Sequence, residues 1–412
     1  MMPTATITAF RARWIFPVDG PPIRDGTLTF ASFDAPNRSF PYSPPKSILG
    51  DFPEPAKSVR DLGNVAIVPG FVNAHTHLDL TDAAGKIPPD PDFTAWLRQV
   101  ISHRMAQSPE AVRAAADTGC RQLLATGTTL VGDISAQGAS WWPLSKAPID
   151  SVIFHEVLGL SPARMTETVT KAKGWWHSHD LGTSRPNLSP HAPYSTGRSL
   201  YRECREFLAN RPGTSPMAVH VAESEAEREL IEHWTGPFVG FLKELGLWSF
   251  AESELIRSFD EIGEGYVAIH ANYMRVDEVR GPVVYCPRTH AAFGHRPHPF
   301  REFLKAGIPV ALGTDSLASN PDLDVLAEAR FVARRNPDVS PATVLKMLTK
   351  FGAVALGREK ECGTLAAGKE ASLVVLPVPD IEVDDPHELL FMNDAAPSAV
   401  MYRGQWRFGD VG

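Results

Sequence analysis

The chain has 412 residues, of which 43% are hydrophobic and 21% are charged, as is ordinary for a soluble globular protein. Its 40 basic and 48 acidic residues give a formal net charge of −8, and the sequence contains no Lys/Arg-rich block. This balance argues against a nucleic acid or an anionic membrane surface as a partner. The length suits one large barrel domain with a smaller companion better than a single small domain.

The cysteines and the apolar segments indicate a cytoplasmic protein. The four cysteines are widely scattered, with no CxxC pair and no disulfide-type spacing, so we expect reduced thiols. The start, MMPTATITAF, lacks the basic stretch and the long apolar core of a signal peptide. No apolar run approaches the roughly 20 residues that a membrane-spanning helix needs.

The N-terminal part of the chain is expected to form short strands. Residues 4–16 and 26–33 alternate apolar and polar side chains, which is typical of strands with one buried face. The Pro/Ser-rich stretch 35–47 that follows predicts a loop.

The far end of the chain has the same character. Residues 371–379 and 399–408 are β-like, and the turn-rich stretch 363–371 leads into them. Two β-rich ends flank a different middle, so we expect residues 1–64 and 362–412 to pair into one small β-sandwich.

Residues 65–361 alternate between short apolar strands and helical stretches. Eight strand candidates follow one another: AIVPGFVNA, TTLVGDI, SVIFHEVL, RPNLSPHA, MAVHVAE, GYVAIHA, PVVYCPR and PVALGTD. Eight strands alternating with helices over about 250 residues predict an α/β fold, a (β/α)₈ TIM-like barrel. A doubly wound open sheet is the alternative, but no Gly-rich dinucleotide fingerprint follows the first strand.

Two histidines follow the first of these strands, residues 65–74. His75 and His77 are two positions apart, so their imidazoles leave the strand end on the same face. This pattern fits a pair of metal ligands, but it also fits two surface histidines at a strand end, so the rest of the chain must decide.

Further polar residues stand at the ends of later strands, which is where a barrel carries its chemistry. They are His191 after the fourth strand, His220 and Glu223 at the fifth, His270 at the sixth and Asp315 at the eighth. Singly, each has an ordinary explanation, such as a loop cap for His191, a core histidine for His220 or a helix N-cap for Asp315. Together they indicate one site.

The types of residue explain the chemistry of that site. His75, His77 and His220 supply imidazole nitrogens and Asp315 a carboxylate oxygen, which are good ligands for zinc and similar divalent ions. A bound divalent ion can bring the pKa of its water to roughly 7. Glu223 follows His220 by three residues and so could reach that water and shuttle its proton.

Six motifs, in this order, resemble those of the amidohydrolase superfamily: PGFVNAHTHLDL, SPHAPYS, HVAESEAE, IHANY, YCPRTHAAFG and GTDSLASNPDLD. The resemblance covers nearly the whole chain. It is strongest to the aminohydrolase branch that includes S-adenosylhomocysteine, guanine and aminodeoxyfutalosine deaminases and the triazine chlorohydrolases.

The resemblance implies a role for each of these residues. One metal ion would be held by His75, His77, His220 and Asp315. Glu223 would be the proton shuttle, His270 would orient the hydroxide and stabilise the developing charge, and His191 would contact the substrate. Asp315 would also take a proton from the attacking water for the leaving group.

The same resemblance predicts a single metal ion. Relatives with two metals usually bridge them with a carboxylated lysine at the end of strand four, where this chain has SPHAP and no lysine. We expect Zn²⁺, although the ligand set also suits Fe²⁺ or Mn²⁺.

The loop after the seventh strand departs from the family. Many relatives have Cys-Pro, a basic residue, Ser and Asn there, whereas this chain has Thr289 and His290 after Arg288. That loop touches substrate in the family, so the change bears on specificity rather than on chemistry. Arg288 is a candidate contact for an anionic substrate group, with a structural role as the alternative.

Three more residues are candidates for the substrate pocket. Glu156, at the end of the third strand, could bond a ribose hydroxyl. Phe93 and Trp96 could wall the pocket, because FTAWLRQVI resembles the aminodeoxyfutalosine deaminase-like members. Aromatic residues at helical spacing are, however, also typical of a plain core.

The sequence thus predicts a metal-dependent hydrolase that deaminates an amino-substituted nitrogen heterocycle. An adenine-type nucleoside with an acidic group, such as 6-aminodeoxyfutalosine, would use all the candidate contacts. The alternatives are hydrolysis of a chloro-heterocycle or a cyclic amide at the same site, or a non-catalytic scaffold, which would be expected to lose metal ligands. We expect a small-molecule substrate, no nucleic-acid or membrane partner, and a homodimer.

Overall fold

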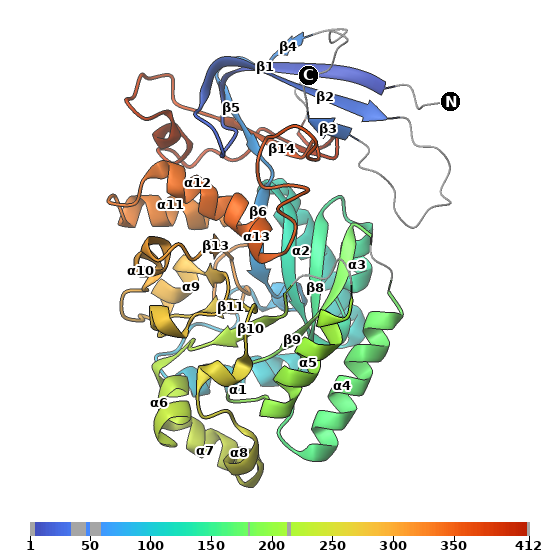
Figure 1. Cartoon of the computed structure of the whole chain (residues 1–412), viewed down its shortest axis with the longest axis vertical. Coiled ribbons are helices and arrows are strands. Elements are labelled where there is room, and N and C mark those ends of the chain that lie inside the picture. Colours follow the sequence, from blue (N-terminus) through green and yellow to red (C-terminus); the bar gives the residue numbers. More distant parts are fainter. Residues whose placement is uncertain (1–4, 34–46, 50–58, 180–181, 212–215, 410–412) are drawn as a thin grey trace.

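The computed structural model describes residues 5–33, 47–49, 59–179, 182–211 and 216–409 (Figure 1). The Pro/Ser-rich stretch 35–47 lies, except for its last residue, outside this part of the chain. Among the described helices, none combines the length and the apolar composition needed to cross a membrane.

The two ends of the chain share one sheet, which lies at the top of Figure 1. Its order is β16-β15-β14-β5-β1-β2-β3, and β4 also pairs with β1. The strands are β1 (Ala5–Ile15), β2 (Ile23–Phe33), β3 (Ser47–Leu49), β4 (Val59–Asp61), β5 (Val65–Pro69), β14 (Leu373–Pro377), β15 (Ala399–Tyr402) and β16 (Gln405–Phe408). The two ends share one sheet, but residues 1–64 and 362–412 do not pair directly among the described strands, because β5 lies between β1 and β14. A two-layered sandwich is not confirmed, since all eight of these strands belong to one sheet.

The eight strands expected in the middle of the chain are present, in two four-stranded parallel sheets. Their orders are β6-β7-β8-β9 and β10-β11-β12-β13, and every pairing within them is parallel. The strands are β6 (Phe71–Thr76), β7 (Thr128–Ser135), β8 (Asp150–Val157), β9 (Ser184–Pro190), β10 (Ala218–Val221), β11 (Val267–His270), β12 (Val283–Tyr285) and β13 (Val310–Leu312). The fold is therefore α/β with parallel strands, as expected.

Backbone hydrogen bonds join these two sheets at both outer edges. The His220 amide donates to the His191 carbonyl oxygen at 3.0 Å, linking the end of β9 to β10. At the other edge, the amides of Thr314 and Asp315 donate to the His75 carbonyl oxygen at 3.0 and 3.1 Å. The contacts that connect the sheets are thus made by residues of the expected site.

The stretch 65–74, expected to be one strand, is in fact divided between two sheets. β5 pairs with β1 and β14 in the terminal sheet, and β6 pairs with β7 in the parallel sheet. Gly70 stands between them, where a β-carbon would lie 2.0 Å from Thr129 Oγ1. This close approach requires glycine and marks the point where the chain passes from one sheet to the other.

Helices follow most of the parallel strands and cover them (Figure 1). The α-helices are α1 (Phe93–Ala106), α2 (Pro109–Ala125), α3 (Trp141–Lys146), α4 (Pro162–His177), α5 (Arg198–Ala209), α6 (Glu225–His233), α7 (Pro237–Glu244), α8 (Trp248–Glu254), α9 (Pro287–Ala292), α10 (Phe300–Lys305), α11 (Val325–Arg335), α12 (Pro341–Leu348) and α13 (Lys350–Ala355). The 3₁₀ helices are η1 (Leu78–Ala83), η2 (Ala136–Gly138), η3 (Phe259–Ile262), η4 (Val276–Glu278) and η5 (Pro386–Leu390). Side-chain caps such as Asp92, which accepts from the Thr94 and Ala95 amides, fix where helices begin.

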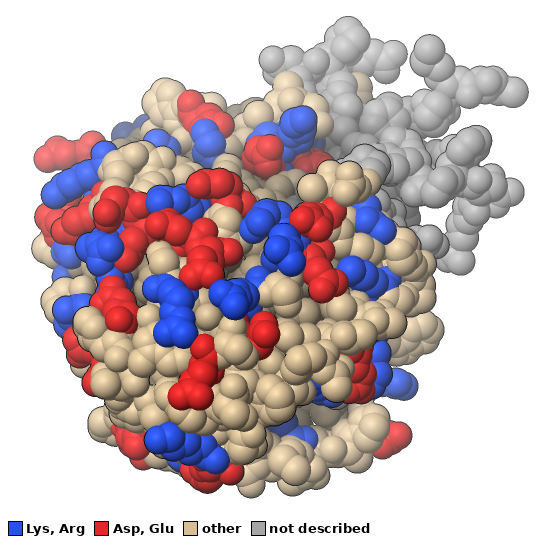
Figure 2. Space-filling model, turned by 60° about the horizontal axis from the view of Figure 1, so that its bottom comes forward, with Lys and Arg blue, Asp and Glu red and all other residues tan. Residues whose placement is uncertain are grey.

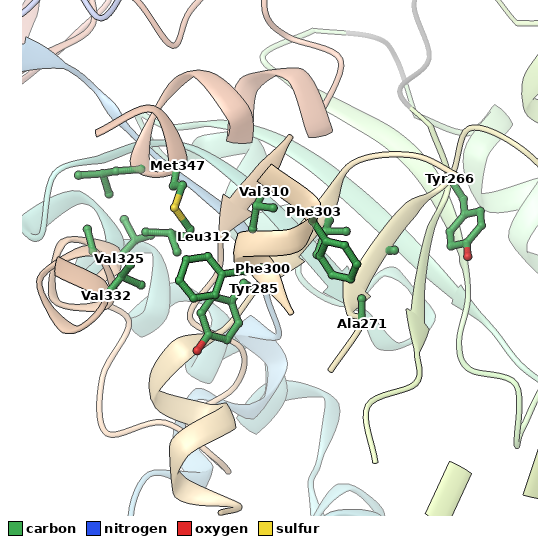
Figure 3. Close-up of a cluster of buried hydrophobic side chains, with 14 of the residues drawn as sticks. Tyr266, Ala271, Tyr285, Phe300, Phe303, Val310, Leu312, Val325, Val332 and Met347 are labelled. Atoms are coloured by element: carbon green, nitrogen blue, oxygen red, sulfur yellow. The ribbon is translucent and has the colours of Figure 1, made fainter. Parts of the chain in front are cut away.

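The largest core cluster packs helices against the strands (Figure 3). Phe300 and Phe303 of α10 lie against side chains of β12 and β13, and Val325 and Val332 of α11 extend the same cluster. These side chains are at most 2% exposed, and each such burial stabilises the fold by roughly 1.5–3 kcal/mol. The packing holds the strands, and therefore their ends, in place.

The surface carries charges of both signs. Lys and Arg side chains alternate with Asp and Glu side chains over the face shown in Figure 2. Surface ion pairs of the described residues include Arg98 with Glu244 and Arg334 with Asp394.

Candidate active site and metal centre

The four expected metal ligands lie together at three strand ends. His75 and His77 come from the end of β6, His220 from β10, and Asp315 follows β13. His77 Nε2 is 3.3 Å from His220 Nε2. Asp315 Oδ1 is 3.3 Å from His75 Nε2 and 3.7 Å from His77 Nε2.

These side chains fit a divalent metal ion. His75 is fully buried, and neither of its ring nitrogens has a hydrogen-bond partner among the described residues, which costs free energy unless a ligand is bound. The donor atoms of His75, His77 and Asp315 lie within 4.8 Å of one another, as do those of His75, His220 and His270. Imidazole nitrogens with a carboxylate oxygen form a donor set suited to zinc.

The protonation of the histidines also suits a metal. Burial, together with the neighbouring histidines, lowers the pKa of His77 and of His220 well below the ordinary value. Burial likewise lowers the pKa of His270 well below it. The three imidazoles are therefore neutral, and only a neutral imidazole has a nitrogen lone pair free for a metal.

The backbone is strained at this same place. Ala222, His270, Ala271 and Asp315 all have a positive φ, between 47° and 66°, which is uncommon for residues other than glycine. They stand just after β10, at the end of β11 and just after β13. Strain of this kind is retained where function requires a particular side-chain direction, and here it occurs beside the predicted ligands.

Glu223 and His270 form the polar group next to the ligands. His270 Nε2 lies 3.4 Å from Glu223 Oε1. Burial, and then the charges of Asp315 and Glu227, raise the pKa of Glu223 well above its ordinary value. A raised pKa makes Glu223 a better proton acceptor than an ordinary carboxylate, which suits a general acid–base group.

Asp315 is in the opposite state. Burial opposes its ionisation, but the neighbouring imidazoles of His75 and His270 bring its pKa below the ordinary value. Asp315 Oδ2 also accepts a hydrogen bond from Ser319 Oγ at 2.8 Å. The surroundings thus shift the pKa values of the two carboxyl groups in opposite directions.

Several residues that hold Glu223 and His270 in place were not predicted from the sequence. Glu227 accepts hydrogen bonds from the amides of Ala222 and Glu223, and Asn272 Nδ2 donates to the Glu223 carbonyl oxygen. His298 Nε2 lies 2.7 Å from the carbonyl oxygen of His270. Glu227 and Asn272 lie in the motifs HVAESEAE and IHANY, so a signal existed for them, but His298 has no such signal.

A cavity of about 420 Å³ opens onto these groups. His77, His220, Glu223, His270 and Asp315 form its polar end. Its remaining wall is largely apolar and includes Leu80, Trp96, Val100, Ile101, Phe241 and Leu245. The volume and the apolar wall suit a small organic molecule with an aromatic ring.

Three of the residues expected to contact substrate line this cavity: His191, Glu156 and Trp96. His191 Nε2 lies 3.7 Å from Glu156 Oε1, and His191 Nδ1 lies 2.6 Å from Ser195 Oγ. The structure adds Arg104 of α1, which also lines the cavity and approaches both Glu156 and His77. No pattern in the sequence indicated that Arg104, rather than another helical arginine, would line the cavity.

Arg288 is not placed as a substrate contact. It does not line the cavity, and its guanidinium is held by Asp322 and Glu328, with shortest distances of 2.6 Å to each. Because two carboxylates already pair with this guanidinium, the geometry favours the structural alternative, and a contact with an anionic substrate group stays a prediction.

Phe93 also has a structural position. It lies outside the cavity lining and packs in the core against Trp96, Phe238 and Phe293, with ring centroids 5.4, 6.3 and 5.7 Å away. These contacts favour the plain-core alternative, in which Phe93 supports Trp96, and its role as pocket wall stays a prediction.

The departing loop after β12 does not line the cavity either. Thr289 Oγ1 lies 3.2 Å from Ser319 Oγ, and His290 Nε2 lies 3.0 Å from the Arg296 carbonyl oxygen. Because Ser319 in turn donates to Asp315, Thr289 reaches the site only through another side chain.

Comparison with known proteins decides the family. Residues 66–407 match the model of the Amidohydrolase family, which is most of the chain. The chain belongs to the amidohydrolase family. It is a hydrolase that acts on carbon–nitrogen bonds, and the predicted resemblance is confirmed.

Individual relatives are distant but match over most of their length. The aminodeoxyfutalosine deaminase of a Nitratiruptor species is 27% identical over 368 residues, covering 85% of this chain and 89% of that protein. The 5-methylthioadenosine/S-adenosylhomocysteine deaminase of Moorella thermoacetica is 28% identical over 368 residues, covering 84% of this chain and 79% of that protein.

A solved structure has the same fold. The adenosine deaminase of Xanthomonas campestris with bound zinc aligns with a TM-score of 0.76 at 21% identity, covering 98% of this chain and 93% of that one. At this identity the likeness concerns the fold.

Proposed function

We propose that this amidohydrolase removes the amino group of an adenine-type nucleoside by hydrolysis and releases ammonia. The observation that carries the proposal is the position of Glu223, beside His270 and Asp315, at the polar end of a cavity with an apolar, aromatic wall. The names of the two curated relatives support a 6-aminopurine nucleoside as the substrate class.

The proposal includes one divalent metal ion, held by His75, His77, His220 and Asp315. Zn²⁺ suits three imidazoles and one carboxylate, and Fe²⁺ and Mn²⁺ are the alternatives. When bound, the ion supplies a water of lowered pKa and stabilises negative charge that develops near it. The strand ends supply all four ligands, which also supports closure of the eight parallel strands into a barrel.

The side chains around the ligands account for the proton transfers. In the reaction, a bond forms between water oxygen and the ring carbon, and the bond from that carbon to the amino nitrogen breaks. Glu223 takes a proton from the attacking water and gives it to the adjacent ring nitrogen. His270 donates a hydrogen bond to the developing oxygen charge, and Asp315 passes the second proton to the departing ammonia.

The cavity bears on the choice of nucleoside. Trp96 offers an aromatic face, and Val100, Ile101, Phe241 and Leu245 surround the space with apolar groups. Apolar walls favour an aromatic or alkyl group on the nucleoside over a zwitterionic one, because burying an unpaired charge is costly. S-adenosylhomocysteine carries a zwitterionic amino acid, whereas 6-aminodeoxyfutalosine carries an aromatic ring that can pack against these walls. We therefore propose 6-aminodeoxyfutalosine ahead of S-adenosylhomocysteine, and the proposal requires the acidic group on that ring to lie in solvent outside the apolar walls.

The proposal is tested by measuring ammonia release from the purified metal-loaded enzyme. The panel contains 6-aminodeoxyfutalosine, 5′-methylthioadenosine, S-adenosylhomocysteine, adenosine, guanine and cytosine. We expect the highest kcat/KM for 6-aminodeoxyfutalosine. Turnover of a chloro-heterocycle or a cyclic amide, with no ammonia from any 6-aminopurine nucleoside, would overturn the assignment.

A further inference from the structure

Arg104 is fixed in the cavity wall by contacts with three other groups. Its Nη1 lies 3.2 Å from Glu156 Oε2, and its Nη2 lies 3.2 Å from Asp79 Oδ2. The same Nη2 lies 3.5 Å from Nδ1 of His77. Arg104 stands in the last turn of α1, and its side chain is 25% exposed, so its charge is held in one place beside the cavity.

This arrangement uses only one oxygen of Glu156. Glu156 Oε1 is buried and has no hydrogen-bond partner among the described residues, although the side chain lines the cavity. Arg104 Nε is likewise buried without a partner in the described part of the chain. A buried acceptor and a buried donor therefore stand unsatisfied on neighbouring side chains of one wall, which is costly unless a ligand completes them.

The chemistry of Glu156 Oε1 defines the group that it fits. A carboxylate oxygen only accepts hydrogen bonds, so its partner must be a donor such as a hydroxyl. An anionic group does not fit, because Asp79 and Glu156 already place two carboxylates around the one guanidinium. Sugar hydroxyls are the groups of a nucleoside that match.

We propose that Arg104 is a positioning residue that fixes the Glu156 carboxylate so that its free oxygen binds the sugar hydroxyls of the substrate. This inference rests on the proposed deamination of a nucleoside. Arg104 acts through Glu156, and neither residue is one of the groups to which we assign a proton transfer. The preference for a nucleoside with intact hydroxyls over one without them is therefore set by Arg104.

The test compares 6-aminodeoxyfutalosine with its 2′,3′-dideoxy analogue in the metal-loaded enzyme. Arg104→Met should lower kcat/KM about 10- to 100-fold for the hydroxylated substrate, the range for losing hydrogen bonds to a charged group, and change the dideoxy value less than about threefold. Arg104→Lys should retain part of the preference, because lysine keeps the charge but cannot bridge two carboxylates.

Three further variants keep the test decisive. Arg104→Met could leave buried carboxylates unpaired, so Arg104→Met/Glu156→Gln is measured beside Glu156→Gln alone, with metal content and melting temperature recorded. We expect the double variant to match Glu156→Gln in its preference, because both changes act on one contact. Arg98→Met, which breaks an exposed pair with Glu244 on the same helix, is the matched control and should keep the full preference.

The outcomes distinguish a failure of the proposed deamination from a failure of the sugar contact. Ammonia release from neither substrate by the wild-type enzyme would overturn the proposed function and this inference with it. Equal turnover of both substrates by the wild type would overturn the sugar contact alone. An equal loss for both substrates in Arg104→Met and in the double variant would show a merely structural arginine.

Discussion

Strand β8 carries one buried acidic residue at its start and another near its end, and the protein surrounds them differently. Both oxygens of Asp150 are occupied, since Tyr402 donates at 2.8 Å, Arg403 at 2.9 and 3.1 Å, and Arg358 at 3.2 Å. Glu156, six residues later, leaves one oxygen without a partner among the described residues, beside the cavity. The hydrogen bonds of Asp150 stabilise the fold, whereas the unpaired oxygen of Glu156 is the atom that we propose binds the substrate.

The same contrast holds for the two ends of the parallel strands in general. At the starting ends, Asp150 ties β8 to the terminal sheet through Tyr402 and Arg403. At the finishing ends, His75 has two ring nitrogens without a partner in the described part of the chain, and the backbone of Asp315 is strained. Substitutions at the finishing ends should therefore remove activity, and substitutions at the starting ends should remove stability.

Loss of a metal ligand should have the largest effect. Asp315→Ala removes the only oxygen ligand of the proposed set and the acceptor for the second proton, so we expect metal content and ammonia release to fall together to background. Elemental analysis and a turnover assay measure both quantities. Asp394→Ala, which breaks an exposed pair with Arg334, is the control and should keep both. Two equivalents of metal in the active wild type would contradict the single-ion site.

Removing the proton shuttle should abolish most turnover but leave the metal in place. Glu223→Gln keeps the size and hydrogen-bonding capacity of the side chain but cannot accept a proton. We expect full metal occupancy and a kcat lower by about 10²-fold or more, in the range of general acid–base catalysis. Near-normal turnover in this variant would assign the proton transfer to another group.

A change at the starting end should affect stability and not chemistry. Asp150→Ala leaves the Arg358 and Arg403 guanidinium groups without their shared carboxylate, and breaking such a buried pair costs about 3–5 kcal/mol. Denaturant unfolding should show that loss, while kcat per folded molecule stays close to the wild-type value. A large drop in kcat with unchanged stability would contradict the division between the two ends.

The smallest expected effect is a pH dependence of stability. Burial raises the pKa of Glu227 to about 8, above its ordinary 4.5, so the folded state holds this proton more tightly than the unfolded state. The protonated Glu227 therefore makes its full contribution to the free energy of unfolding below about pH 4.5, and this contribution is lost as the pH rises toward 8. Melting temperatures of the wild type should fall by a few degrees relative to Glu227→Gln between pH 5 and 8. A constant difference between the two proteins would contradict the raised pKa.

Much of the site could be predicted because its residues follow strands. His75, His220, His270 and Asp315 stand at the ends of apolar runs and so can be recognised in the sequence. The carboxyl ends of parallel strands lie together irrespective of the conformation of the loops. Loop and helix residues gave no such constraint. Arg288 and Phe93 were placed in the pocket from their position in motifs, yet neighbouring carboxylates and aromatic rings hold them elsewhere.

The sequence by itself determined the eight parallel strands, the strand character of the two chain ends and the residue types from which the metal ligands are proposed. These features depend on local periodicity and on residue type, which the sequence contains directly. Only the tertiary structure decided the break at Gly70, the contacts of Arg104 and the free oxygen of Glu156. Those depend on how side chains from α1, η1 and β8 meet, and residues far apart in the sequence meet according to the packing of the whole chain.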